Sequence, residues 1–426
     1  MQRLIIVSNR LPVTIDRRKG ELHFEPSVGG LATGLVSFHK SYNSVWIGWP
    51  GINSVKIKGE EKDIEARLRS ESCYPVFLSQ NDVEDYYDGF CNRTIWPLFH
   101  YFTEHAVYSK DSWQAYEQVN AAFSNAVVEV AEPGDIIWIH DYQLMLLPKL
   151  LRERLPEATV GFFLHIPFPS FEIFRLLPWR KQILDGLLGA DLVGFHTYDY
   201  ARHFVNSVHR LLGHEAAMGQ ITTADRVIRA DVFPMGIDYK RYSSAAQGSK
   251  VRAEITKFRQ KLGDRTIILS IDRLDYTKGI PQRLEAFSAF LEKHPEYREK
   301  LILIQVVVPS RAKVEHYAML KKHVDELVGA INGKHGSIGW TPIWYLYRSL
   351  PFHSLIALYT MADIALVTPL RDGMNLIAKE YIATKTDGKG ILILSETTGA
   401  AKELGGAIII NVNDQEEIVQ ALEKAL

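Results

Sequence analysis

The feature that most constrains the fold is an alternation of short apolar runs with longer amphipathic stretches, repeated along almost the whole chain. This alternation is typical of a parallel sheet with helices packed against it. The run Asp135-Ile-Ile-Trp-Ile-His140 is continuously apolar between its ends, as expected for a strand covered on both faces. In the first half, the predicted strands are Leu4–Val7, Val45–Gly48, Asp135–His140, Thr159–His165 and Leu192–Phe195, and the predicted helices are Asp111–Ala131 and Gln143–Leu155.

The same pattern restarts in the second half. The predicted strands there are Arg265–Ser270, Lys300–Val307, Asp363–Val367, Gly390–Leu394 and Ala407–Asn411, and the predicted helices are Pro281–Lys293, Ala312–Val328 and Asn375–Lys385. A chain of 426 residues is too long for one ordinary core. We therefore expect an α/β protein of two doubly wound, Rossmann-like domains facing a cleft, with boundaries 1–238 and 239–426. The charged run Lys58–Lys62 is interpreted as a solvated loop.

Composition excludes several classes of protein. Lys and Arg number 49 against 50 Asp and Glu, so the chain lacks the basic excess that nucleic acid or an anionic membrane surface demands. Cys73 and Cys91 cannot build a disulfide framework, which indicates buried thiols in a reducing compartment. The first apolar run is too short for a signal peptide, and no run is long enough to span a membrane. We expect a cytoplasmic protein that has neither nucleic acid nor membrane as a partner.

Several chemically versatile residues in the first half lie at predicted strand ends, where α/β proteins bind ligands. Arg10 ends the first strand, and an arginine there suits an anion such as phosphate. The loop that contains Gly30 could approach a ligand closely or could be a plain turn. Asp141 and His165 end successive strands of one sheet, although a lone histidine in such a place is more often structural. Tyr86, Tyr87 and Trp96 form an aromatic patch that could stack on sugar or simply pack.

The second half contains two sharper motifs. Asp272-Arg273-Leu-Asp275-Tyr-Thr-Lys278-Gly279 follows the first strand of that half, and its two cations could point at one diphosphate. Thr368-Pro-Leu-Arg371-Asp372-Gly373-Met374-Asn375-Leu376 leaves a strand, turns and enters a helix whose first amides can bind phosphate. Glu380, further along that helix, could accept both hydroxyls of a ribose. The alternatives are a surface ion pair for the first motif and an ordinary strand–turn–helix for the second.

No Asp-x-Asp metal motif, zinc spacing, P-loop or G-x-G-x-x-G fingerprint occurs in the sequence. The sequence therefore predicts a mechanism without a metal or other cofactor, in which protein cations offset developing negative charge.

With these motifs in place, the chain resembles the trehalose-6-phosphate synthases, retaining glycosyltransferases of the two-domain GT-B kind. The resemblance covers nearly the whole chain and rests on four runs: Val7-Ser-Asn-Arg10, Ile137-Trp-Ile-His-Asp141, Phe163-Leu-His-Ile-Pro-Phe-Pro169 and Leu366-Val-Thr-Pro-Leu-Arg-Asp-Gly-Met-Asn-Leu376. It implies transfer of glucose from a nucleotide donor, UDP-glucose foremost, to glucose 6-phosphate with retention. The product would be α,α-trehalose 6-phosphate, made by a UDP-forming, metal-independent synthase.

The resemblance also implies roles for individual residues of the donor site, which would lie mainly in the second domain. Gly30, Arg273, Lys278 and the amides of Gly373, Met374, Asn375 and Leu376 would hold the diphosphate, Glu380 the ribose, and Asp372 and His165 the hydroxyls of the transferred glucose. The main chain near Leu350 would contact the base. Because the family's usual residue there is aromatic, the choice among UDP, ADP and GDP stays open.

The acceptor site would lie mainly in the first domain. By the same resemblance, Arg10, Tyr87 and Arg311 would bind the acceptor's phosphate, and Trp96 and Asp141 its sugar ring. Either Trp46 or Trp49 would border this pocket, and the sequence does not choose between them.

The catalytic residues implied are Arg273, Lys278, Asp141 and His165. A retaining glycosidase would use a close pair of carboxylates, one of them a nucleophile, and no convincing candidate for that nucleophile is present. The family's route is front-face displacement, in which the departing phosphate takes the acceptor's proton.

Two other readings stay open: a related synthase with another phosphorylated acceptor such as glycerol 3-phosphate, and a catalytically silent subunit that senses sugar phosphates. The sequence also leaves open whether copies associate into a homo-oligomer. It stops at Ala425-Leu426 within a helical pattern, where the family usually continues. We therefore expect either a truncated chain or half of a synthase–phosphatase fusion.

Overall fold

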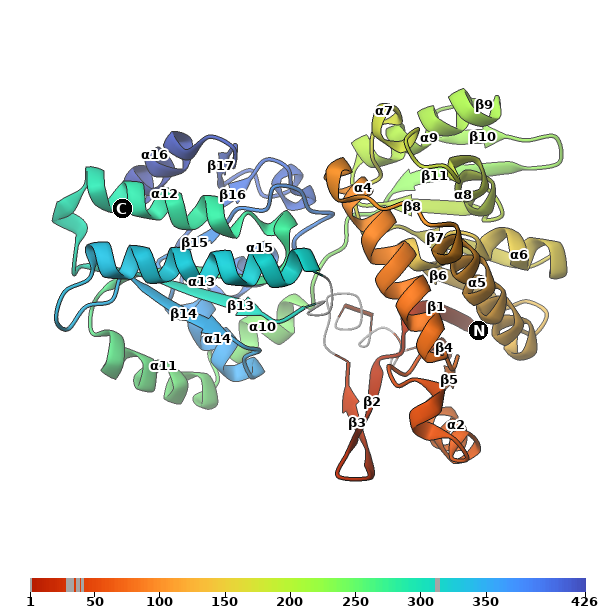
Figure 1. The fold of residues 1–426 in the computed structure, drawn as a ribbon, viewed down its shortest axis with the longest axis horizontal. Helices are drawn as coiled ribbons and strands as arrows, with labels where there is room; N and C mark the ends of the chain where they lie inside the picture. Colours follow the sequence, from red (N-terminus) through yellow and green to blue (C-terminus); the bar gives the residue numbers. More distant parts are fainter. Residues whose placement is uncertain (1, 28–33, 36–38, 40–41, 311–314) are drawn as a thin grey trace. The chain divides into compact units, whose positions relative to one another are not determined.

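The computed structural model describes residues 2–27, 34–35, 39, 42–310 and 315–426. The chain separates into two compact units, Met1–Pro234 and Met235–Leu426. Each is an α/β unit built on a parallel sheet (Figure 1), as the sequence predicts. Of the sites expected from the sequence, Gly30 and Arg311 lie outside the described residues.

The first unit is built on a nine-stranded sheet in the order β5-β4-β1-β6-β7-β8-β11-β10-β9. The strands from β5 to β11 are parallel, and β10 and β9 continue the sheet antiparallel. Its strands are β1 Leu4–Arg10, β4 Ser44–Trp49, β5 Cys73–Pro75, β6 Ile136–His140, β7 Thr159–Phe163, β8 Leu192–Phe195, β9 Glu215–Ala217, β10 Gln220–Thr222 and β11 Val227–Val232; β2 Val13–Arg18 and β3 Glu21–Pro26 form a separate hairpin.

The helices of the first unit include an unusually long π-helix, η2 Val83–Ile95, which packs against α5. The α-helices are α2 Glu61–Ser70, α3 Gln80–Asp82, α4 Trp96–Phe99, α5 Lys110–Val130, α6 Leu147–Arg154, α7 Phe171–Phe174, α8 Arg180–Leu187 and α9 Tyr198–Leu212; short 3₁₀ turns are η1 Ser54–Ile57, η3 Thr103–His105 and η4 Tyr142–Leu144. Polar N-caps begin the longer helices: Ser109 caps α5 and Thr197 caps α9.

The second unit is built on a six-stranded, fully parallel sheet in the order β14-β13-β12-β15-β16-β17. Its strands are β12 Thr266–Arg273, β13 Leu301–Val308, β14 Ile343–Tyr347, β15 Ile364–Val367, β16 Ile391–Ser395 and β17 Ile408–Ile410. Its helices are α10 Tyr239–Ala246, α11 Ser249–Leu262, α12 Ile280–Lys293, α13 Glu315–His335, α14 Phe352–Met361, α15 Leu376–Thr384 and α16 Gln415–Ala425, with short turns η5 Tyr276–Lys278, η6 Pro295–Tyr297 and η7 Gly399–Lys402.

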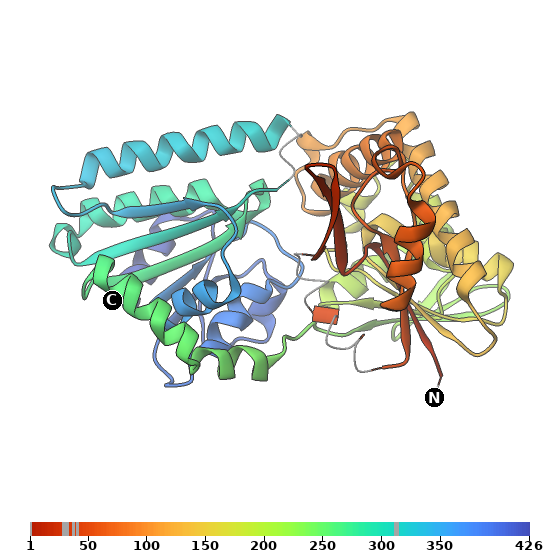
Figure 2. The ribbon, with the colours of Figure 1, turned by 90° about the horizontal axis from the view of Figure 1, so that it is seen from below.

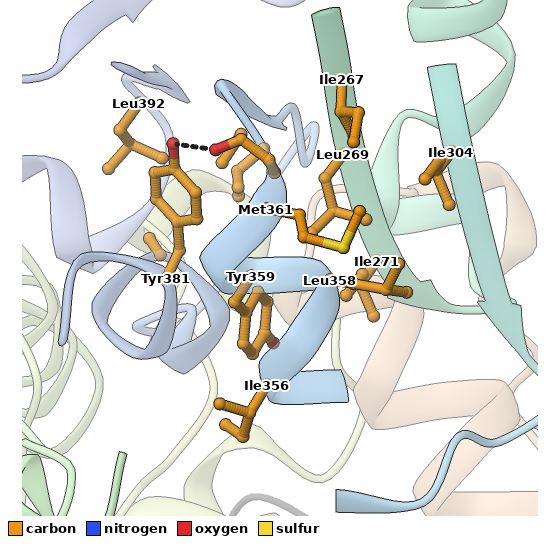
Figure 3. Close-up of a cluster of buried hydrophobic side chains, with 14 of the residues drawn as sticks. Ile267, Leu269, Ile271, Ile304, Ile356, Leu358, Tyr359, Met361, Tyr381 and Leu392 are labelled. Carbon is orange, nitrogen blue, oxygen red and sulfur yellow. Dashed lines mark hydrogen bonds between the residues drawn. The ribbon is translucent and has the colours of Figure 1, made fainter. Parts of the chain in front are cut away.

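Alternate residues of the second unit's strands supply two separate cores. Ile267, Leu269 and Ile271 of β12 point to the face covered by α10, α11, α14 and α15. Figure 3 shows these isoleucines and leucine packed against α14, with the Tyr381 hydroxyl bonded to a backbone carbonyl. Ile268 points to the opposite face, which α12, α13 and α16 cover (Figure 2). Burial on both faces explains why these strands are apolar without alternation.

Most elements begin and end within a few residues of their predicted positions, and Leu192–Phe195 is predicted without error. Three predictions differ from the structure, the first being that the helix predicted to end at Val328 continues to His335. The run Lys58–Lys62 is not a loop throughout, because α2 begins at Glu61, where acidic residues suit a helix N-terminus. The segment Gln143–Leu155 is not one helix: it divides into η4 and α6, with Pro148 at the start of α6.

Candidate functional site

Each sheet has a point where the strand order reverses, and ligands of open α/β sheets bind beside this point at the carboxyl ends of the strands. In the second unit, β12 lies between β13 and β15, so the switch point is at β12 and β15. The loop after β12 contains Lys278, and the loop after β15 contains Asp372. The two loops are joined by a hydrogen bond of 2.8 Å from the Leu370 N–H to the Thr277 carbonyl.

The structure brings three of the predicted donor residues into direct contact. The Lys278 ammonium donates to Oδ2 of Asp372 at 2.6 Å, and the Asn375 amide donates to the same oxygen at 3.0 Å. Only 10% of the Lys278 side chain and 16% of the Asp372 side chain are exposed, so water screens this pair weakly. The pair therefore places a cation and a carboxylate in fixed positions at the switch point.

A glycine is required between Lys278 and helix α12. Gly279 has φ of 61°, in the left-handed region, and an added Cβ would lie 2.2 Å from the Thr368 carbonyl oxygen. No larger residue fits without moving one of the two loops. The glycine thus allows the backbone after β12 to approach the backbone after β15.

The predicted turn between β15 and a helix is present, and that helix is α15. Asn375 is its N-cap, with φ of 69°, and its side chain accepts a hydrogen bond of 3.1 Å from the Ala378 N–H. Gly373 and Met374 before it are buried, and Leu376 begins the helix. The main-chain N–H groups at a helix N-terminus favour negative charge.

Glu380, one turn further along α15, has both carboxyl oxygens held by phenols. The Tyr242 hydroxyl donates to Oε1 and the Tyr359 hydroxyl to Oε2, each at 2.8 Å. Burial raises the pKa of Glu380, and the two phenols act in the opposite direction because they bond to the carboxylate. Each oxygen keeps a further acceptor position for a ligand hydroxyl.

The remaining donor candidates of the second unit are less constrained. Arg273 is the last residue of β12 and is exposed. Leu350 lies between β14 and α14, half-buried against the core that contains α14.

The sequence analysis missed Arg283, which is completely buried on α12 and bonds to Asp272, Thr368, Gln305 and the Lys278 carbonyl. A signal was available. Arg283 shares the helix face of Ile280, Leu284 and Phe287, at the spacing of residues that face the core.

In the first unit the switch point is at β1 and β6. Arg10 ends β1, and its guanidinium lies 4.6 Å from the centre of the Trp49 ring and donates to the Thr14 hydroxyl at 3.3 Å. The Trp49 and Tyr87 rings are 6.3 Å apart, so Arg10, Trp49 and Tyr87 form one group. Burial lowers the pKa of Arg10, and no carboxylate among the described residues forms an ion pair with it. A desolvated arginine of this kind suits an anionic ligand.

The structure decides between the two candidate tryptophans. Trp46 is completely buried, and its indole N–H donates to the Ser8 hydroxyl at 2.8 Å. Trp49 instead packs beneath Arg10, so it is the tryptophan beside the predicted acceptor residues.

Asp141 and His165 are close together at the ends of β6 and β7. Asp141 has φ of 75°, and its Oδ1 accepts a hydrogen bond of 3.1 Å from the His165 main-chain N–H. The His165 Nε2 lies 3.0 Å from Nδ1 of the completely buried His140. Burial lowers the pKa of His140 to about 3 and that of His165 well below its usual value. Both rings are therefore neutral near pH 7.

Trp96, the last predicted acceptor residue, is 5% exposed. Its ring lies 4.2 Å from the ring of His100 and 5.8 Å from that of Tyr142, which follows Asp141. Packing in the interior of the unit thus accounts for most of its surface.

In the described part of the chain, no group of three or more His, Cys, Asp or Glu could hold a metal ion. None of the helices described there is both long and apolar enough to cross a membrane.

Comparison with known proteins gives consistent results. The sequence profile of glycosyltransferase family 20 matches residues 2–426. A bifunctional trehalose-6-phosphate synthase/phosphatase from Thermoproteus tenax is 50% identical over 435 residues, which cover 100% of this chain and 58% of the relative. The chain thus spans little more than half the length of that relative.

Several solved structures are similar over the whole chain, among them the following two. An α,α-trehalose-phosphate synthase (UDP-forming) from Burkholderia xenovorans in complex with glucose-6-phosphate is 32% identical, with a TM-score of 0.89 and coverage of 100% of this chain and 92% of the other. An E. coli structure, described as trehalose-6-phosphate bound with UDP-2-fluoro glucose, is 34% identical, with a TM-score of 0.88 and coverage of 100% and 91%. The chain therefore belongs to glycosyltransferase family 20, among the trehalose-6-phosphate synthases.

Proposed function

We propose that this chain transfers glucose from UDP-glucose to glucose 6-phosphate with retention of configuration, forming α,α-trehalose 6-phosphate and UDP. The observation that carries the proposal is the group of Lys278, Asp372 and Asn375 beside the N-terminus of α15, at the switch point of the second unit. This group combines a fixed cation, the main-chain amides of a helix N-terminus and a carboxylate. A nucleoside diphosphate sugar needs each of these: cation and amides for the phosphates, carboxylate for sugar hydroxyls.

The second unit is proposed as the nucleotide-sugar domain. Lys278, Arg273 and the amides from Gly373 to Leu376 hold the diphosphate. Glu380, oriented by two tyrosines, accepts the ribose hydroxyls, and the main chain near Leu350 contacts the base. Asp372 accepts from hydroxyls of the transferred glucose.

The first unit is proposed as the acceptor domain. Arg10, packed on Trp49, donates to the phosphate of glucose 6-phosphate together with Tyr87. Arg311 supplies a further cation. Asp141 and Trp96 contact the acceptor's sugar ring, and neutral His165 bonds to a hydroxyl of the donor glucose.

The chemical step in this proposal depends on stabilising the leaving group. As the bond between the glucose carbon and the diphosphate lengthens, negative charge collects on the phosphate oxygens beside Lys278 and Arg273. The departing phosphate accepts the proton of the acceptor hydroxyl, which then attacks from the same face. Asp141, held by the His165 N–H, orients that hydroxyl.

A product assay tests the proposal. UDP-, ADP- and GDP-glucose are each incubated with glucose 6-phosphate or glycerol 3-phosphate, and the products are identified by NMR. We expect one efficient combination, UDP-glucose with glucose 6-phosphate, and an α,α-1,1 linkage in the product. Transfer to glycerol 3-phosphate alone, or binding of glucose 6-phosphate without turnover of any donor, would reject it. We further propose that the chain acts in the cytoplasm, where both substrates are available.

A further inference from the structure

Arg283 is the most deeply buried charged side chain that the structure describes near the donor residues, with an exposed fraction of 0%. Its guanidinium uses all three nitrogens as donors. Nε donates to the Thr368 hydroxyl at 2.9 Å and Nη1 to the Gln305 side chain at 3.1 Å. Nη2 donates to the Asp272 carboxylate at 2.8 Å and to the Lys278 carbonyl at 3.1 Å.

These acceptors come from four different parts of the second unit. Asp272 lies near the end of β12, Gln305 within β13, and Thr368 directly after β15, and these strands are neighbours in the sheet. Lys278 is the last residue of η5, and its side chain is the one proposed to bind the diphosphate. One side chain thus connects the carboxyl ends of the central strands to the backbone of Lys278.

Stability alone is a poor explanation for this arrangement. The same face of α12 is otherwise apolar, with Ile280, Leu284 and Phe287 all completely buried. Removing two charges from water costs more free energy than their mutual attraction commonly returns, so apolar residues of similar volume often give equal or greater stability. What an apolar residue cannot do is hold several separate polar groups in fixed directions, as the planar guanidinium does.

We propose that Arg283 is a positioning residue for the donor: it fixes the loop after β12 and the loop after β15 relative to each other, so that Lys278 and the N-terminus of α15 meet the diphosphate together. The proposal rests on the function proposed above. A continuous path of hydrogen bonds leads from Arg283 to the proposed donor residues. Arg283 donates to the Lys278 carbonyl and to the Thr368 hydroxyl. The Leu370 N–H of one loop donates to the Thr277 carbonyl of the other. Beyond these contacts lie the Lys278 ammonium and Asp372.

The test compares UDP affinity with fold stability in the full chain. Arg283→Lys keeps the positive charge but cannot donate in the directions of the planar fork. By calorimetry, we expect its Kd for UDP to rise about tenfold or more, because small displacements of binding groups have effects of this order. The Kd for glucose 6-phosphate should change less than about twofold, since the residues proposed to bind it lie on other loops. A folded Arg283→Lys protein that binds UDP as the wild type does would overturn the proposal.

Two further variants keep the test decisive if Arg283→Lys does not fold. Thr368→Val removes one hydroxyl from the network at nearly constant volume, and we expect the Kd for UDP to rise about threefold. An unchanged Kd in Thr368→Val, with Arg283→Lys unfolded, would assign Arg283 to stability and overturn the proposal. Asn332→Ala is the matched control: it removes two hydrogen bonds to Ile343 at the start of β14, far along the sheet from the donor loops. It should lower Tm and leave the Kd for UDP unchanged.

The design separates this inference from the proposed function. If the wild type binds neither UDP nor UDP-glucose, the proposed function fails. If the wild type binds UDP and the Arg283 and Thr368 variants bind it equally well, only the positioning role fails. Calorimetry also reports the fraction of competent sites, so irreversibly unfolded protein in a variant shows as fewer sites at an unchanged Kd, whereas reversible unfolding raises the apparent Kd and is excluded by a Tm well above the assay temperature.

Discussion

The switch points of the two units share a topology but differ in chemistry. Both lie where the first strand of a unit's main sheet pairs with the fourth strand of that sheet in chain order, β1 with β6 and β12 with β15. At β12 and β15 the side chains are charged and bonded to one another, as in the pairs Lys278–Asp372 and Arg283–Asp272. At β1 and β6 they are mainly aromatic rings and neutral histidines, and Arg10 is the described cation that is proposed to bind the acceptor.

The difference is the basis for the ligand proposed for each unit. A diphosphate leaving group gains charge during the reaction, so the cations that stabilise it must already be in place. A sugar phosphate keeps its charge and presents hydroxyls and a ring face, which hydrogen bonds, aromatic rings and one arginine can bind. The same fold thus supports both tasks, because the loops after the strands decide the chemistry.

The largest effect is expected for Lys278→Ala. Its charge is needed most as the diphosphate departs, so kcat should fall about 10²–10³-fold while the KM for glucose 6-phosphate stays the same. Steady-state kinetics measure both constants. Lys293→Ala is the control, because Lys293 lies on α12 but pairs at the surface with Glu416 and Glu423. A rise in acceptor KM as large as the fall in kcat would contradict the division of tasks between the units.

The reverse pattern is expected for Arg10→Ala. Loss of a charge-assisted contact to the acceptor's phosphate should raise the KM for glucose 6-phosphate about tenfold to hundredfold and leave the Kd for UDP unaltered. Arg17→Ala serves as the comparison, since Arg17 lies in β2 of the β2–β3 hairpin and is paired with Glu60. Equal losses of UDP and acceptor affinity would instead indicate that Arg10 is structural.

A smaller effect is expected on stability at acidic pH, which should change differently in the two units because different buried groups titrate in each. His140 stays neutral in the folded protein because burial lowers its pKa from 6.5 to about 3. Below about pH 6.5 the unfolded chain binds a proton that the folded chain does not, so stability falls as the pH falls towards 3, by about 1.4 kcal/mol per pH unit for this group. In the second unit, burial raises the pKa of Asp272 and of Glu380, which acts in the opposite direction.

Hydrogen exchange at pH 7 and pH 5, followed separately for peptides of each unit, measures this difference. We expect the first unit to lose more protection on acidification, and His140→Asn to reduce that loss. His209→Asn, at an exposed position of α9, should leave the pH dependence as it is. A steeper loss in the second unit would reverse the comparison.

The smallest effect is expected for chelation. If Lys278 and Arg273 offset the charge of the leaving group, EDTA should alter the transfer rate less than about twofold. Initial rates with and without EDTA decide this. Loss of activity that Mg²⁺ restores would show that protein cations are not sufficient at the second unit's switch point.

The sequence by itself determined the fold class and the position of most strands and helices, because both depend on local periodicity and on local stop signals. It also placed Arg10, Asp141, Lys278 and Asp372 after strands, since a polar residue is conspicuous at the end of an apolar run. The sequence did not predict the hairpin of β2 and β3 or the π-helix η2. We recognised no periodic pattern of apolar residues in these segments.

Only the tertiary structure decided how these residues pair. Lys278 and Asp372 are 94 positions apart and meet because β12 and β15 are neighbours in the sheet. The choice of Trp49 over Trp46 and the burial of Arg283 have the same origin. Side-chain type and spacing are local properties, whereas burial and hydrogen-bond partners depend on which distant segments pack together, and that is settled only when the sheet has formed.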